Sequence, residues 1–133
     1  MQIQTLKRAS GAVAYVDREE SCVIEIVFYD CSEPPVELTK VMFGDLTATL
    51  TFARGFIING RNNQNVLDIN GGTVSDDGVL TLKLQPEDNI IFGALTPGEI
   101  EVHRLVLKWT WTDNDDIEMT GKAQYNILVR EAP

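Results

Sequence analysis

The side chains best suited to bind a metal ion lie in one acidic stretch. Asp113, Asn114, Asp115 and Asp116 follow one another, and Glu118 comes two residues later. Oxygen ligands at alternate positions can hold calcium, but the EF-hand loop also needs a glycine at its sixth position and a distant bidentate glutamate. Neither is present here, and Asn and Asp are typical turn residues. We therefore interpret Asp113–Asp116 as a solvated hairpin turn and predict no metal site, with calcium binding as the alternative.

Two further groups of acids could supply carboxylates, Asp76-Asp77 and Asp17-Arg18-Glu19-Glu20. A glycosidase needs two carboxylates that face each other across a cleft. Neighbouring residues in a turn diverge and point to water, so we interpret both groups as charged loops. A small hydrolase that uses the acidic loops, with Asp115, Asp116 and Glu118 as its acids, remains an alternative.

The chain has a single histidine, His103, and two cysteines, Cys22 and Cys31. His103 lies in a predicted strand with no Ser or Cys motif beside it, which favours ordinary packing over general-base catalysis. An extended strand would separate the two sulfurs by close to 30 Å, whereas a disulfide needs Cα atoms within about 7 Å. We predict that these cysteines do not pair, which indicates a reduced protein made in the cytoplasm. Two cysteines and one histidine are also too few ligands for a zinc site.

Trp109 and Trp111 share one face of a predicted strand, since they are two residues apart. If exposed, they would form a flat platform on which sugar rings could stack. If buried, each would contribute about 150–250 Å² to a core. Leu105 and Leu107 lie on the same face, which favours the core, and the platform stays open as the alternative.

Composition limits the function further. The chain has 133 residues and a mass of 14.8 kDa, which predicts one domain over residues 1–133. No stretch approaches the ~18 apolar residues of a membrane span, and the first eight residues lack the apolar run of a secretory signal.

The net charge is −9, and the few basic residues are scattered among acids. Nucleic acid and anionic lipid are therefore poor partners. No catalytic motif occurs, so we predict no enzymatic activity, no cofactor and no small-molecule substrate.

The dominant apolar period is two, which is typical of strands buried on one face. It is clearest in four stretches, Thr47–Arg54, Val79–Leu84, His103–Thr112 and Lys122–Arg130. Residues that tolerate tight turns separate the runs, at Asn59-Gly60, Asn70-Gly71-Gly72 and Asp77-Gly78. Another strand follows Cys22 and ends before Pro34-Pro35, and one short helical turn is predicted near residues 86–92. The pattern predicts an all-β, antiparallel two-sheet sandwich of eight or nine strands.

Several short segments follow one another along the chain in a recognisable order. They are Val36-Glu37-Leu38-Thr39, Thr47 to Phe52, Val66 to Val74, Gly78 to Leu84, Leu84-Gln85-Pro86-Glu87-Asp88-Asn89, Gly98-Glu99-Ile100 and Thr120 to Ile127. Over about residues 20 to 130 the chain resembles the small immunoglobulin-like β-sandwich modules of phage and prophage virion proteins. It departs from them where Arg18-Glu19-Glu20-Ser21 replaces a "G-D-T-F" opening and where Asp113–Asp116 replaces a glycine-containing turn.

The resemblance implies a structural part of a virion, in the tail, baseplate or neck, with no catalytic residues. Its expected partners are other virion proteins and copies of itself, and its expected location is the virion, after synthesis in the bacterial cytoplasm. Apolar residues near turns, namely Phe43, Phe56, Ile57 and Ile58, are candidate contact points, and the alternative for them is ordinary core. A carbohydrate-binding or adhesin module on the same scaffold is the alternative function, because a fold does not by itself select a function.

Overall fold

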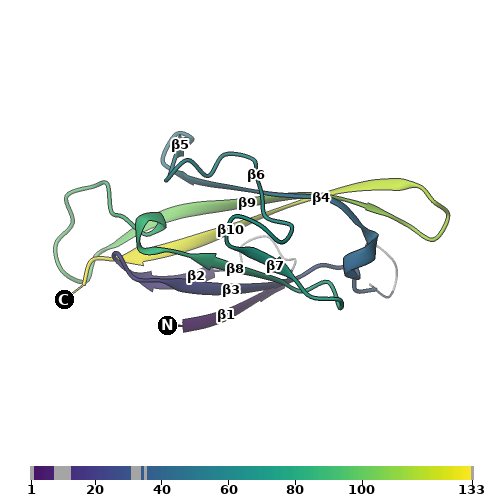
Figure 1. Cartoon of the computed structure of the whole chain (residues 1–133). Helices are drawn as coiled ribbons and strands as arrows, with labels where there is room; N and C mark the ends of the chain where they lie inside the picture. The colour runs from purple at the N-terminus through teal and green to yellow at the C-terminus, as the bar shows by residue number, and fades with distance from the viewer. Residues whose placement is uncertain (1, 8–12, 31–33, 35, 133) are drawn as a thin grey trace.

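The computed structural model describes residues 2–7, 13–30, 34 and 36–132, which form two β-sheets packed face to face (Figure 1). The first sheet has the order β1-β3-β8-β7, with β1 (Gln2–Lys7), β3 (Cys22–Val27), β8 (Leu80–Leu84) and β7 (Gly72–Val74). The second has the order β2-β10-β9-β4-β5, with β2 (Val13–Asp17), β10 (Glu118–Arg130), β9 (Ile100–Thr112), β4 (Phe43–Phe52) and β5 (Phe56–Ile57). A sixth strand, β6 (Gln64–Asn65), also pairs with β4.

This strand order is that of an immunoglobulin-like sandwich. Strands β1, β3, β8 and β7 occupy the places of A, B, E and D in one sheet, and β4, β9 and β10 those of C, F and G in the other. The predicted all-β two-sheet sandwich is therefore confirmed. The described residues contain ten strands, two of which, β5 and β6, have only two residues each.

The sheets are mainly antiparallel, as predicted, but two strand pairs at the N-terminus are parallel. Strand β1 pairs in parallel with β3, and β2 pairs in parallel with β10. The N-terminal segment thus adds one edge strand to each sheet. Alternation with a period of two is the same in parallel and antiparallel strands, so the sequence pattern could not distinguish them.

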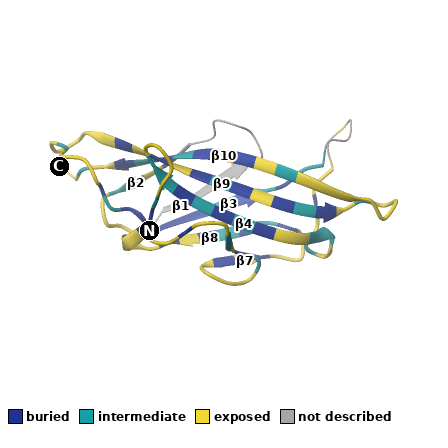
Figure 2. Cartoon of the chain, turned by 90° about the horizontal axis from the view of Figure 1, so that it is seen from above, coloured by how far each residue is buried: buried dark blue, intermediate teal, exposed yellow. Residues whose placement is uncertain are grey.

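Strands β9 and β10 form the longest hairpin, with thirteen residues in each strand. Their register runs from Thr112 opposite Glu118 to Ile100 opposite Arg130. Both strands exceed the predicted limits, because residues 100–102 and 118–121 continue the ladder. The hairpin extends past the other strands at one end of the sandwich (Figures 1 and 2).

Short connections follow the turn chemistry of the sequence. The predicted helical turn is confirmed as η2 (Pro86–Asp88), with proline at its start and acids behind it. A second 3-10 turn, η1 (Lys40–Met42), was not predicted. At the predicted Asp77-Gly78 turn, Gly78 has φ of 83°, and a Cβ there would collide with the carbonyl oxygen of Leu38. Neither helical turn of the described chain is long and apolar enough to cross a membrane.

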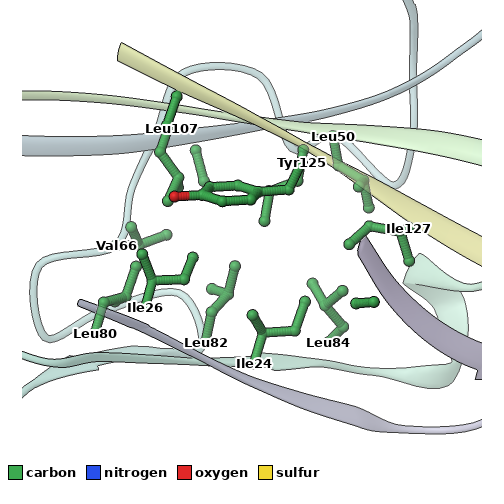
Figure 3. Close-up of a cluster of buried hydrophobic side chains, with 14 of the residues drawn as sticks. Ile24, Ile26, Leu50, Val66, Leu80, Leu82, Leu84, Leu107, Tyr125 and Ile127 are labelled. Carbon is green, nitrogen blue, oxygen red and sulfur yellow. The ribbon is translucent and has the colours of Figure 1, made fainter. Parts of the chain in front are cut away.

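The core lies between the sheets and is built from the predicted inward faces. Ile24, Ile26, Leu82 and Leu84 rise from the first sheet toward Leu107, Tyr125 and Ile127 of the second, and the Tyr125 ring lies across the gap between them (Figure 3). All of these side chains are buried. The interlocked core makes β9 and β10 a rigid support whose opposite, outer face carries polar and apolar side chains.

Candidate interaction surface

Trp109 and Trp111 belong to the core, with 2% and 3% of their surface exposed. The Trp109 ring packs edge-on against Phe28 at a centroid distance of 4.8 Å. Its indole also covers Gly121 on β10, where an added Cβ would come within 2.6 Å of Nε1. The core interpretation is confirmed, and a sugar-binding platform made of these two rings cannot form.

The acidic stretch Asp113–Asp116 is the turn of the β9–β10 hairpin, as predicted. The Asp113 carboxylate accepts hydrogen bonds from the backbone N–H groups of Asp115 and Ile117, both at 2.9 Å. Asp116 takes a positive φ of 58°. The turn therefore uses an acidic side chain to satisfy its own backbone. In the part of the chain that the structure describes, no three His, Cys, Asp or Glu side chains are grouped so as to hold a metal ion.

His103 lies on the inner face of β9 and is fully buried beside a second ionisable residue. Its Nε2 is 2.7 Å from a carboxylate oxygen of Glu101, which is itself only 6% exposed. The same carboxylate accepts hydrogen bonds from the backbone N–H groups of Phe92 and Gly93. Burial raises the pKa of Glu101, but the hydrogen bond from His103 and then those from Phe92 and Gly93 outweigh it, so the pKa lies below its usual value.

This pair is closed off from solvent by aromatic rings. Phe52 and Phe92 stack at 5.4 Å, and both rings lie about 6 Å from the His103 ring, at 5.8 and 6.0 Å. The interpretation of His103 as a packed strand residue agrees with this burial. The sequence analysis missed Glu101, although it shares its face of β9 with His103 and Leu105.

A second buried ionic contact joins the loop after β5 to η2. Arg61 donates from Nε to Asp88 at 2.6 Å and from a terminal nitrogen to its other carboxylate oxygen at 3.0 Å. Asp88 also accepts from the Asn59 amide at 2.9 Å and from the backbone N–H of Gln85 at 2.7 Å. With four donors around one carboxylate, Asp88 holds the loop, the turn and the sandwich together. It is a structural anchor, because the carboxylate is fully buried and these four donors occupy both of its oxygens.

The four apolar contact points proposed from the sequence differ in how far their side chains are exposed. Ile58 is fully buried, so its assignment to the surface is wrong, because its loop folds back onto β4. Phe43 is half-buried and packs against Phe28 at 5.2 Å. Ile57 is also half-buried. Phe56 is 56% exposed, and its ring meets Phe92 at 5.2 Å.

The other described residues singled out in the sequence lie in strands and turns. Cys22 is buried in β3, and Cys31 lies outside the described residues, so the predicted absence of a bond between them stays a prediction. Asp76 and Asp77 are exposed in the β7–β8 turn. Asp17 forms an ion pair with Arg130 at 2.7 Å across the parallel β2–β10 pair.

The outer face of the six-stranded sheet carries an unusual row of apolar side chains. The register places Tyr15 of β2 opposite Leu128 of β10, and Leu128 opposite Val102 of β9. Tyr15 is 57% exposed and Val102 is 51% exposed. Ile100, two residues along β9, is exposed on the same face. We call Tyr15, Leu128, Val102 and Ile100 the apolar row.

A groove of about 450 Å³ lies at the β2 edge of the sheet, next to part of the apolar row. Its lining includes Tyr15, Leu128 and Ile100 of the row, together with Val16, Asp17, Glu20, Ser21, Cys22 and Arg130. Because β2 is the last strand of this sheet, its outer backbone edge borders the same region. Edge strands with unpaired backbone groups can accept another chain.

Beyond the apolar row, the same outer face becomes basic. Lys108 and Lys122 lie directly opposite each other on β9 and β10, and Arg104 lies four residues before Lys108. Like charges placed directly opposite across strands are destabilising. In the described part of the chain, no carboxylate lies within ion-pair distance of these three side chains. We call Arg104, Lys108 and Lys122 the basic cluster.

Comparison with known proteins gives little further guidance. No family model matches the chain, and no curated protein matches it. Among solved structures, the chain is similar to that of the cysteine protease inhibitor EhICP2 from Entamoeba histolytica, at 11% sequence identity over 96% of this chain and 95% of that chain, with a TM-score of 0.38. A likeness at that TM-score carries no information on function.

Proposed function

We propose that the protein is a non-enzymatic structural component of a phage or prophage virion, in its tail, baseplate or neck. It acts by docking on neighbouring subunits through the outer face of the six-stranded sheet. The observation that carries this proposal is the apolar row, whose members lie side by side across three strands and are not covered by any element among the described residues.

The apolar row has the properties of a protein contact. Large exposed apolar side chains that are contiguous mark interaction sites, whereas isolated ones need no explanation. The row sits on β9 and β10, whose inner faces are locked in the core. A rigid support of this kind costs little conformational entropy when a partner binds, because the contacting side chains are already positioned.

The residues that could do chemistry support a binding role by their positions. His103 and Glu101 are buried together, and Asp113 closes its own turn. The family resemblance supports the placement in a virion, where the expected partners are other virion proteins and further copies of this chain. Synthesis then takes place in the bacterial cytoplasm, and the final location is the particle.

The proposal is tested first by gene neighbourhood and by mass spectrometry of purified particles. We expect portal, tail or baseplate genes beside this one, and peptides of this chain in the particles. Flanking metabolic genes together with absence from the particles would contradict the proposal.

The role of the apolar row is tested by substitution of one exposed valine. Val102→Lys puts a charge in the centre of the row and is expected to abolish incorporation into particles. Val41→Lys is the matched control, because Val41 is 91% exposed and lies in η1, just before Phe43, which pairs with Trp111 at the opposite end of β9 from Val102. Equal incorporation of the two variants would exclude the row as the docking surface.

A further inference from the structure

The basic cluster has a charge opposite to the net charge of the chain. Twenty acidic residues and eleven basic ones give the chain a net charge of −9. Even so, the central part of the outer sheet face presents Arg104, Lys108 and Lys122. Two acids also lie on this face: Asp45 of β4 lines the same hollow as the two lysines, and Glu118 of β10 lies toward the hairpin turn.

A shallow hollow of about 410 Å³ lies at the basic cluster. Lys108 and Lys122 line it together with Asp45 and three threonines, Thr47 of β4, Thr110 of β9 and Thr120 of β10. The Thr110 hydroxyl already accepts a hydrogen bond from the backbone N–H of Asp45 at 2.9 Å. Ammonium and hydroxyl donors of this kind suit a carboxylate, which accepts hydrogen bonds through two oxygens.

The apolar row and the basic cluster form one continuous strip. Arg104 is two residues beyond Val102 on the same face of β9, and Lys108 is four residues further. At ~3.3 Å per residue, the strip from Val102 to Lys108 is about 20 Å long. A partner that covers the row and extends about 20 Å along β9 therefore also meets the cluster.

A second copy of this chain is a poor partner for the strip when the two faces meet. A twofold arrangement centred between row and cluster would place the charges of one copy on the apolar row of the other, and one centred on the cluster would place Lys108 and Lys122 near Arg104. Like charges brought together in an interface disfavour association. The strip instead requires a partner whose surface is acidic where the cluster lies.

We propose that this strip binds an acidic polypeptide surface of a different protein. Partner carboxylates would pair with Lys108, Lys122 and Arg104, and apolar partner side chains would cover Tyr15 and Val102. This inference rests on the proposed docking function and adds the chemistry of the partner. Charge complementarity selects that partner and speeds its association.

The test uses poly-L-glutamate as a probe and maps its contacts by amide chemical shifts in NMR. At about 0.01 M salt, where the Debye length is ~30 Å, shifts are expected at residues 104–108 and 120–124. They should vanish at about 1 M salt, where it is ~3 Å. Absence of binding at low salt, or shifts spread over every basic residue, would overturn the inference.

A pair of charge reversals supplies the control. Lys122→Glu should weaken the binding of poly-L-glutamate by about tenfold, because one attraction is lost and one repulsion is gained. Lys83→Glu makes the same change of charge at an exposed position on β8, in the other sheet, and should leave the affinity unchanged. Equal loss in the two variants would mean that only net charge matters, which would overturn the inference.

The test also separates an acidic protein from nucleic acid. Three cations give few phosphate contacts, and the apolar row offers nothing to a phosphate backbone. Oligodeoxythymidylate is therefore expected to bind more weakly than poly-L-glutamate, and the reverse order would refute a polypeptide partner. If the chain is found in particles but does not bind poly-L-glutamate, the acidic partner is wrong and the virion role stands.

Discussion

Replacement of Asp88 by alanine should be among the most destabilising single changes in this protein. The carboxylate is fully buried and accepts hydrogen bonds from Arg61, Asn59 and the backbone N–H of Gln85. Asp88→Ala would leave the Arg61 guanidinium, which is 8% exposed, without its counter-ion. Arg61 would keep only its hydrogen bonds to Gln64 and to the carbonyl oxygen of Asn70.

The expected loss is about 3–5 kcal/mol in the free energy of unfolding, the range found when one partner of a buried ion pair is removed. For a chain of this length, each kcal/mol lowers Tm by about 4 °C. Thermal unfolding followed by circular dichroism should therefore show a fall of roughly 12–20 °C. Urea unfolding should give the same order of loss.

Two comparisons show whether an uncompensated charge is the cause. The double variant Arg61→Met/Asp88→Leu removes both charges and should recover much of the loss, because an apolar pair of similar size often replaces a buried ion pair without cost. Lys40→Met breaks the exposed ion pair of Lys40 with Asp68 and should leave Tm unchanged within error. A fall for Asp88→Ala no larger than that for Lys40→Met would refute the reasoning.

Three further predictions concern packing and protonation. Gly121→Ala should lower the free energy of unfolding in urea by about 1–3 kcal/mol, because the new methyl group overlaps the Trp109 indole. A second substitution, Trp109→Leu, should relieve that loss, and additive losses in the double variant would contradict the overlap. Tryptophan emission should be shifted to the blue and resist quenching by acrylamide, since Trp109 and Trp111 are buried; easily quenched emission would contradict their place in the core. Folding lowers the pKa of Glu101 from 4.5. The ionised carboxylate therefore stabilises the folded state fully above pH 4.5, and this stabilisation is lost as the pH falls through the lower pKa of the folded state. Glu101→Gln should therefore flatten the dependence of stability on pH below about 4.5, and an unchanged slope would contradict this assignment.

The inward faces of the long strands could be predicted from the sequence. Alternation from Leu105 to Trp111 and from Ala123 to Val129 fixed which side chains enter the core, and all of those inward residues are buried. The turns at Asn59-Gly60 and Asp77-Gly78 could also be predicted, since few other residues tolerate a positive φ. These features depend only on neighbours in the chain.

Features that depend on register could not be predicted. The row of Tyr15, Leu128 and Val102 exists because three strands distant in sequence align side by side, and β2 is parallel to its neighbour. Arg61 lies in an irregular loop with no period to mark it as buried. The position of Asp88 behind Pro86 predicted an acid that favours a helical turn, but it did not reveal that Asp88 pairs with buried Arg61.

The burial of Ile58 also could not be predicted from the sequence. It stands beside turn residues, which suggested exposure, yet its N–H bonds to the carbonyl oxygen of Leu50 and draws its side chain into the core. Local composition could not separate it from its neighbour Ile57, which is half-buried. Only the return of the loop onto β4 decides the difference.

Amine-reactive footprinting of assembled particles tests the outer-face docking most directly. Each lysine is labelled in the free protein and in purified particles, and the extent of labelling is read by mass spectrometry. We predict that Lys108 and Lys122 become protected in the particle while Lys83, on the opposite sheet, stays reactive. Unchanged labelling of Lys108 and Lys122, with protection at Lys83, would contradict docking through the outer face of the six-stranded sheet.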